Sequence, residues 1–221
     1  MHNIVNNLLS IQNELKIKIK KLNFENYNPN IVAVSKTFTI KDILPLINHG
    51  HLHFGENKVQ ESIEKWTSIK SDFKDIKLHM IGKLQTNKVK YVVPLFDYIH
   101  SVDSLKLAEK ISQQQVKNNK IMKLFIQINI GNENQKSGIL IDQLDNFYNK
   151  CTNDLGLNVI GLMCLPPNDN KSQVYFSKMK ELVKKLQLKD ISMGMSNDYL
   201  EAISYQSTYL RIGSKIFGER N

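Results

Sequence analysis

The chain has 221 residues, of which 41% are hydrophobic and 23% charged, and its formal net charge at pH 7 is +9. This length allows one sizeable hydrophobic core and is short for two, so we expect a single domain over residues 1–221. No apolar run approaches the roughly 18 residues of a membrane span, and the N-terminus shows no secretory signal. These features exclude a membrane-spanning protein and favour a cytoplasmic one with no membrane partner.

The positive charge raises the question of a nucleic-acid partner. The lysines, however, are spread along the chain, mostly at helix ends or on polar faces, without interleaved aromatic residues. Solvated helix faces explain this pattern better, so no nucleic-acid partner is expected. The two cysteines, Cys151 and Cys164, lack the density of a disulfide scaffold and the spacing of metal ligands. We expect two free thiols, Cys151 on a helix and Cys164 just beyond a strand.

The predicted elements begin with an amphipathic helix at residues 4–22, where apolar residues recur at helical spacing. The run Ile31-Val32-Ala33-Val34-Ser35-Lys36 follows, and its nearly continuous apolar character predicts a strand buried on both faces. Strands and helices then alternate to the C-terminus. Further strands are predicted at 51–55, 78–82, 98–102, 123–129, 157–163, 190–193 and 209–212, and further helices at 40–49, 58–69, 87–92, 104–116, 140–152, 171–187 and 197–204.

Eight strand–helix units with short connections predict a parallel sheet with right-handed crossovers. Their number favours a closed (β/α)8 TIM barrel, an α/β fold, with the N-terminal helix as an addition. An open doubly wound sheet is the alternative, but no Gly-x-Gly-x-x-Gly follows the first strand. In such barrels, functional residues lie at the C-terminal ends of the strands, and phosphate groups commonly bind after strands seven and eight.

Small residues with free backbone N–H groups follow the last two predicted strands. Ser196 follows the seventh strand, Gly213 and Ser214 follow the eighth, and a helix is expected to begin near Lys215. This arrangement is typical of a phosphate site, although a Gly-Ser turn with a helix cap is the alternative explanation. Lys36 ends the first strand, which is adjacent to the eighth in a closed barrel. A lysine and a phosphate site would then face the same barrel mouth.

Lys36 and Arg211 have side chains suited to a phosphorylated pyridine cofactor. Burial and the nearby Arg211 would depress the pKa of the Lys36 amine and make it available for a Schiff base, while emergence into solvent is the alternative. A guanidinium that faces a pyridine nitrogen would donate a hydrogen bond and keep that nitrogen unprotonated. An ordinary ion pair for Arg211 is equally compatible with the local sequence.

From about residue 31 to the C-terminus, the order of six motifs resembles that of the pyridoxal phosphate homeostasis protein family. The motifs are Ala33-Val34-Ser35-Lys36, Phe54-Gly55-Glu56-Asn57-Lys58-Val59-Gln60-Glu61, His79-Met80-Ile81-Gly82-Lys83-Leu84-Gln85-Thr86-Asn87-Lys88, Gly161-Leu162-Met163, Ser192-Met193-Gly194-Met195-Ser196-Asn197-Asp198 and Arg211-Ile212-Gly213-Ser214-Lys215-Ile216-Phe217-Gly218-Glu219-Arg220. The resemblance implies a fold like the barrel half of alanine racemase. It also implies that pyridoxal 5′-phosphate (PLP) is bound as a Schiff base on Lys36.

The resemblance assigns the other site residues as well. It implies that Arg211 faces the ring nitrogen and that Asn57 lies near the ring. The residues implied to hold the phosphate are Ser196, Gly213 and Ser214. The loops at 129–138 and 164–167 depart from the family pattern, and both are expected to border the barrel mouth.

A racemase requires two bases, one on each face of the substrate Cα, and Lys36 could provide one. In the racemases that the family resembles, the other is a tyrosine of an additional domain on a partner subunit, and we expect no such domain here. We therefore expect no turnover and no catalytic residue, but reversible PLP binding by a monomer that supplies PLP-dependent enzymes. A PLP-dependent racemase of low activity and a basic nucleic-acid or protein-binding module are the alternatives.

Three further features are interpreted structurally. His51 and His53 alternate along one strand face, but no Cys, Asp or Glu stands at a convincing ligand spacing, so no metal is expected. His79 is interpreted as a hydrogen-bonded core histidine, and Trp66 as core packing.

Overall fold

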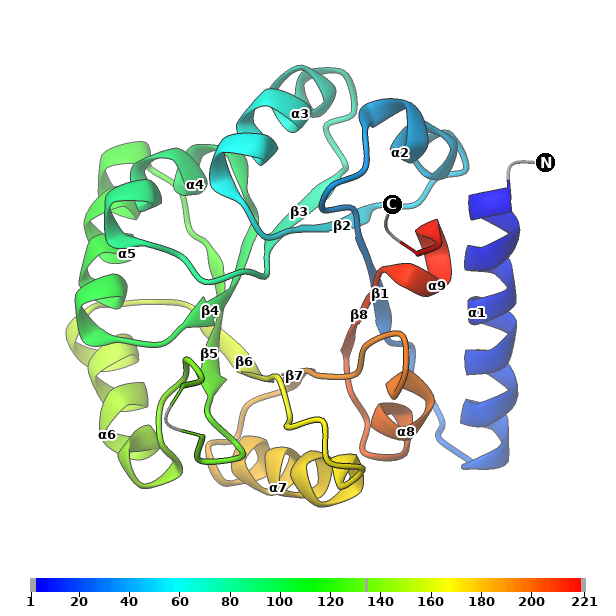
Figure 1. Cartoon of the computed structure of the whole chain (residues 1–221). Coiled ribbons are helices and arrows are strands. Elements are labelled where there is room, and N and C mark those ends of the chain that lie inside the picture. Colours follow the sequence, from blue (N-terminus) through cyan, green and yellow to red (C-terminus); the bar gives the residue numbers. More distant parts are fainter. Residues whose placement is uncertain (1–2, 134, 220–221) are drawn as a thin grey trace.

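A computed structural model describes residues 3–133 and 135–219 of the chain. Asn134 of the 129–138 loop and Arg220 of the C-terminal motif lie outside the described residues. Within these ranges, eight parallel strands pair in chain order and close into a barrel, with the helices around them (Figure 1). The strands are β1 (Asn30–Val34), β2 (His53–Glu56), β3 (Lys77–Met80), β4 (Tyr98–Val102), β5 (Lys123–Ile128), β6 (Val159–Cys164), β7 (Asp190–Ser192) and β8 (Tyr209–Ile212).

The barrel closes between its first and last strands, as the predicted TIM barrel requires. In the β1–β8 pairing, Ile31 lies opposite Leu210 and Ala33 opposite Ile212. β1 ends at Val34, so Lys36 lies two residues beyond the strand rather than at its last position. The register nevertheless brings the C-terminal ends of β1 and β8 together, and the predicted fold is confirmed.

Helices connect the strands on the outside of the barrel. The α-helices are α1 (Asn3–Lys21), α2 (Ile40–Asn48), α3 (Val59–Asp72), α4 (Val89–Leu95), α5 (Leu105–Asn118), α6 (Leu144–Asn149), α7 (Ser172–Lys185), α8 (Tyr199–Ser204) and α9 (Ser214–Phe217). The described residues also form two 3-10 helices, η1 (Thr86–Lys88) and η2 (Ile141–Gln143), and a π-helix, η3 (Lys150–Asp154). The helix predicted over 140–152 is therefore a succession of three short elements, η2, α6 and η3.

The N-terminal helix α1 is present as predicted and packs beside α8 and α9 at the edge of the barrel (Figure 1). Its apolar stripe is buried, and Leu8 and Ile11 belong to the large apolar cluster of the fold. Asn7 Nδ2 donates a hydrogen bond of 2.9 Å to the carbonyl oxygen of Ile216 in α9. The first helix of the chain thus holds the short helix that follows β8.

Two cores stabilise the fold. A large apolar cluster fills the layer between strands and helices, and it includes the fully buried Trp66, as predicted. A smaller cluster fills the barrel itself and comprises Val32, Tyr98, Phe125, Met163 and Tyr209. Such filling is expected, because the interior of an eight-stranded barrel is packed by inward side chains rather than open.

Both cysteines are buried and free, which confirms the predicted thiols. Burial raises the pKa of each thiol to about 12. Cys151 lies in the π-helix η3, whereas Cys164 is the last residue of β6 and not beyond it, because pairing with β5 continues to Ile128 opposite Cys164. Along the described chain, no helix combines the length and the apolar character that crossing a membrane would require.

Candidate functional site

A cavity of about 580 Å³ opens where the strands end. All six residues proposed for the site contribute to its lining: Lys36, Asn57, Ser196, Arg211, Gly213 and Ser214. They follow or end β1, β2, β7 and β8, so closure of the barrel brings together residues up to 178 positions apart in the sequence (36 to 214). The predicted meeting of a lysine and a set of small residues at one mouth is therefore found in the structure.

The segment around Lys36 is held on both sides. Thr37 has a φ of +71°, in the left-handed region that β-branched residues rarely adopt. Its N–H donates a hydrogen bond of 2.8 Å to the Glu61 carboxylate of α3. This contact fixes the chain immediately after Lys36, which is itself half-buried.

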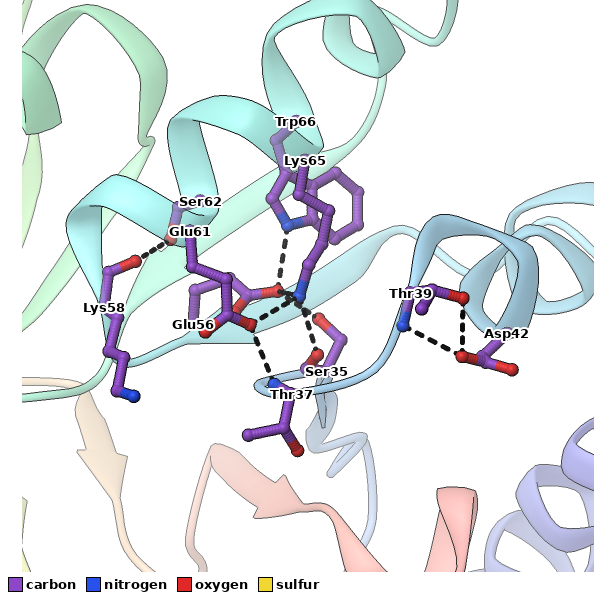
Figure 2. Close-up of polar contacts among 10 residues, drawn as sticks. All are labelled: Ser35, Thr37, Thr39, Asp42, Glu56, Lys58, Glu61, Ser62, Lys65 and Trp66. Carbon is purple, nitrogen blue, oxygen red and sulfur yellow. Dashed lines mark hydrogen bonds and ion pairs between the residues drawn. The ribbon is translucent and has the colours of Figure 1, made fainter. Parts of the chain in front are cut away.

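The buried carboxylate of Glu56, at the end of β2, joins Ser35, which follows β1, to α3 (Figure 2). One oxygen of Glu56 accepts hydrogen bonds from Ser35 Oγ at 2.8 Å and Trp66 Nε1 at 2.9 Å. The same oxygen forms an ion pair with Lys65 Nζ at 2.9 Å. Lys65 also donates to the carbonyl oxygen of Ser35 at 3.0 Å. The residue that precedes Lys36 is thus held through both its side chain and its backbone.

Asn57 lines the cavity and also carries a buried polar atom without a partner in the described chain. Among the described residues, its Oδ1 is buried and has no hydrogen-bond partner. Gly82, which also lines the cavity, passes so close that a Cβ there would lie 2.5 Å from the carbonyl oxygen of Asn57. A buried amide oxygen without a partner is costly.

Arg211 lies at the floor of the cavity with a relative exposure of 4%. Its Nη1 donates to Ser192 Oγ at 2.5 Å and its Nη2 to the carbonyl oxygen of Cys164 at 2.8 Å. The sequence left an ordinary ion pair open as the role of Arg211. In the described part of the chain, no carboxylate forms an ion pair with this guanidinium. Burial lowers the pKa of Arg211, but a guanidinium remains charged at neutral pH.

The small residues meet beside the end of β1, where Gly213 lies close to Val34. Ser196 Oγ accepts long hydrogen bonds from the N–H groups of Gly213, at 3.3 Å, and Lys215, at 3.4 Å. Gly213 caps α9, which begins at Ser214 and spans only four residues, so the helix predicted near Lys215 is a single turn. Hydroxyl and backbone N–H donors from two strands therefore face one space, and this donor set fits an oxyanion such as a phosphate.

The two divergent loops lie at the mouth. Leu165, Pro166 and Pro167 line the cavity, as expected. The 129–138 loop contacts them, because Lys136 Nζ donates to the carbonyl oxygen of Pro166 at 3.3 Å and Gly131 packs closely against Pro167.

Sequence reasoning did not identify Ser192 and His100 as neighbours of the site. His100 Nδ1 lies 2.8 Å from Ser192 Oγ, the acceptor of the Arg211 hydrogen bond. A signal was available, because β2, β3 and β4 each carry a histidine. In a barrel, consecutive strands are neighbours, so inward histidines on them are placed to interact.

The other histidines have structural partners. His79 is fully buried and hydrogen-bonded, as predicted. His51 Nε2 lies 2.9 Å from the carbonyl oxygen of His53, and His53 Nδ1 lies 2.9 Å from His79 Nε2. Within residues 3–133 and 135–219, no group of three His, Cys, Asp or Glu side chains is arranged to hold a metal ion.

Comparison with known proteins identifies the family. The family described as "Alanine racemase, N-terminal domain" matches residues 11–221. The chain is 37% identical to the pyridoxal phosphate homeostasis protein of Haemophilus influenzae, over 99% of this chain and 97% of that protein. This chain belongs to the pyridoxal phosphate homeostasis protein family. A second member, from Aquifex aeolicus, is 37% identical over 86% of each chain.

Solved structures include a relative that covers most of this chain. PipY of Synechococcus elongatus, in its structure with PLP bound, has a TM-score of 0.79 and 30% identity, covering 92% of this chain and 100% of that one. Alanine racemase from Corynebacterium glutamicum has a TM-score of 0.65 at 14% identity, and 61% of that chain is covered. The second likeness concerns the fold alone.

Proposed function

We propose that this chain binds PLP reversibly as a Schiff base on Lys36 and acts in the homeostasis and supply of PLP. The observation that carries the proposal is the convergence of an amine, a buried guanidinium and a set of N–H and hydroxyl donors on one cavity of about 580 Å³. When bound, PLP supplies an aldehyde that condenses with an amine, releasing water, and a ring that can withdraw electrons. The PLP-bound relative PipY supports the identity of the ligand.

Each lining residue has a proposed role that follows from its chemistry. Lys36 provides the amine, and its neighbours Ser35 and Thr37 hold it in place through the contacts with α3. Arg211 donates to the ring nitrogen and, because it does not release its proton, keeps that nitrogen unprotonated. Asn57 Oδ1 receives a donor near the ring.

The phosphate is proposed to bind where β7 and β8 end. Ser196, Gly213 and Ser214 offer hydroxyl and backbone N–H donors that converge there. The long contacts of Ser196 Oγ with the N–H groups of Gly213 and Lys215 are weak enough to be exchanged for stronger charge-assisted ones.

We propose binding rather than turnover because an unprotonated pyridine ring is a weak stabiliser of carbanions. The related proteins are named for PLP homeostasis, not for an enzymatic activity. A racemase-type enzyme of low activity is the second candidate, favoured by the shared barrel fold of alanine racemase. Sustained racemisation of amino acids by the purified, PLP-loaded protein would select it.

The proposal extends to the setting of the protein. We propose one barrel domain over residues 1–221, acting as a cytoplasmic monomer with PLP-dependent enzymes as recipients. Two free, buried cysteines suit a reducing compartment. Sedimentation of the PLP-loaded protein, alone and together with candidate apoenzymes, would test the proposed monomer and the proposed recipients.

The decisive experiment is borohydride reduction of the PLP-loaded protein followed by peptide mass spectrometry. A pyridoxyl adduct is expected on the peptide that contains Lys36, and Lys36→Ala should abolish it. Lys41→Ala, which removes an exposed lysine of α2, is the matched control and should leave the adduct intact. An adduct that persists in Lys36→Ala on another lysine would overturn the assignment.

A further inference from the structure

A continuous chain of side-chain hydrogen bonds runs through the barrel interior and ends at Arg211. Successive contacts join Arg211 Nη1 to Ser192 Oγ at 2.5 Å, and Ser192 Oγ to His100 Nδ1 at 2.8 Å. His100 Nε2 lies 2.9 Å from His79 Nδ1, and His79 Nε2 lies 2.9 Å from His53 Nδ1. We call four of these residues the histidine array: Ser192, His100, His79 and His53.

The histidine array spans the barrel from one end to the other. Arg211 lines the cavity at the C-terminal ends of the strands. His53 begins β2 and lines a second cavity, of about 480 Å³, at the N-terminal ends of the strands. Between these two ends, His79 belongs to β3, His100 to β4 and Ser192 to β7. The array therefore links strands that are far apart in the sequence.

The buried members of the array are neutral and rigidly packed. Ser192, His79 and His100 have a relative exposure of 0%. Burial lowers the pKa of His79 and of His100 well below the ordinary value, and for His100 the Arg211 charge adds to the effect. The ring of His79 stacks on Tyr98 with centroids 4.1 Å apart, and the ring of His100 stacks on Phe125 at 4.3 Å. Neither imidazole can rotate without displacing an aromatic neighbour.

The guanidinium sets the direction of every hydrogen bond in the array. Arg211 can only donate, so the Ser192 oxygen accepts from it. In the described chain, the other side-chain contact of that oxygen is His100 Nδ1. A buried hydroxyl hydrogen without an acceptor is costly, so we assign the Ser192 hydroxyl proton to this nitrogen. His100 must then carry its proton on Nε2 and donate to the next imidazole. By the same step, His79 is protonated on Nε2 and donates to His53 Nδ1.

We propose that the histidine array positions Arg211: its hydrogen bonds are polarised by the guanidinium charge, stabilise this buried cation and hold it toward the cofactor ring. The role toward the cofactor rests on the proposed function, whereas the polarity of the array is a property of the protein alone. In each hydrogen bond of the array, the accepting atom faces the neighbour that is nearer the cation. This arrangement replaces the carboxylate partner that a buried guanidinium commonly has. Because a guanidinium does not accept a proton, the array is no proton path into the cavity.

The polarity is tested by the nitrogen chemical shifts of the imidazoles in PLP-free protein, measured by 15N–1H NMR. The Nε2-protonated form is expected for His79 and His100. In Ser192→Ala, the donor to His100 Nδ1 is lost, and both rings should become mixtures of the two neutral forms. His53→Phe removes the far end but not the source of polarity, so His79 and His100 should keep the Nε2 proton.

A merely structural role would not make Ser192→Ala change the position of the imidazole protons while His53→Phe leaves it unchanged. His49→Gln, which alters an exposed histidine outside the array, is the matched control and should change neither ring. If Ser192→Ala does not fold, Ser192→Cys keeps a weaker donor at the same position and should shift the rings in the same direction. Nδ1-protonated rings in the wild type, or rings unaffected by the change at Ser192, would overturn the proposal.

A second readout uses PLP itself. In Ser192→Ala, an Arg211 donor and His100 Nδ1 lose their partner, so affinity for PLP should fall roughly ten-fold and the visible absorbance of the complex should shift. Ser192→Thr retains the hydroxyl and is expected to restore both. Unchanged affinity and absorbance in Ser192→Ala would overturn the positioning role. If the wild type binds no PLP, the proposed function fails, while the NMR experiment still decides the polarity of the array.

Discussion

Removal of Lys65 should destabilise the protein more than removal of the charge on its partner, Glu56. The two groups form a buried pair, with side-chain exposures of 7% and 0%. Lys65→Met keeps the length of the side chain but leaves the Glu56 carboxylate with only its neutral donors, from Ser35 and Trp66. In Glu56→Gln, by contrast, Lys65 retains the Glu61 carboxylate at 3.1 Å and the Ser35 carbonyl oxygen.

These contacts set the expected magnitudes. A buried charge left without its counterion costs about 3–5 kcal/mol of the free energy of unfolding, which we expect for Lys65→Met. Glu56→Gln retains one acceptor oxygen for the three donors and should cost about 1–3 kcal/mol, as for one imperfect buried hydrogen bond. Lys178→Met removes an exposed pair with Glu181 and should cost less than about 1 kcal/mol.

The assay is urea-induced unfolding of the four proteins at pH 7, followed by circular dichroism. The expected order of destabilisation is Lys65→Met, then Glu56→Gln, then Lys178→Met. A Glu56→Gln variant less stable than Lys65→Met would refute the reasoning, because it would show that Glu61 does not compensate Lys65. Equal stability of Lys65→Met and Lys178→Met would show that burial adds nothing to this pair.

Three further changes test other parts of the site and the fold. Gly82→Ala places a Cβ against the backbone of Asn57 and should cost about 1–3 kcal/mol by overpacking, with weaker PLP binding in a titration; unchanged values would contradict the close approach. Burial lowers the pKa of His51 and of His53 to about 4, below the ordinary 6.5, so the unfolded chain binds protons more readily and stability should fall as pH decreases from 6.5 to 4. Protonation of each histidine should lower the free energy of unfolding by about 3 kcal/mol across that window. In unfolding curves measured between pH 7 and 4, the free energy of unfolding of His51→Gln should therefore fall less steeply with decreasing pH than that of the wild type. Thr37→Gly removes backbone strain of about 1–2 kcal/mol from a threonine in the left-handed region, but the greater chain entropy of glycine in the unfolded state offsets about 0.5–1 kcal/mol of this gain. Thermal unfolding should therefore show unchanged or slightly higher stability. A clear loss of stability would contradict strain at this position.

Most of the fold follows from local patterns in the sequence. Apolar runs such as Ile31–Val34 alternate with amphipathic segments, and their number and short connections favour a parallel barrel. The boundaries are less accurate where hydrogen bonding decides them. β1 ends at Val34, and β6 continues to Cys164 because its pairing with β5 extends that far. The helix predicted over 140–152 divides into short elements for which the apolar periodicity contains no signal.

By itself, the sequence determined the order of the elements, the motifs of the family and the six residues that line the cavity, because each is encoded in a short continuous stretch. Only the tertiary structure decided which side chains surround them. The Glu56–Lys65 pair and the histidine array join residues 9 to 92 positions apart, on different elements. Their pairing depends on strand register and on which face of a strand turns inward, and a shift of one residue would exchange those faces. Closure of the barrel sets both, and so places a buried cation at the end of a chain of neutral imidazoles.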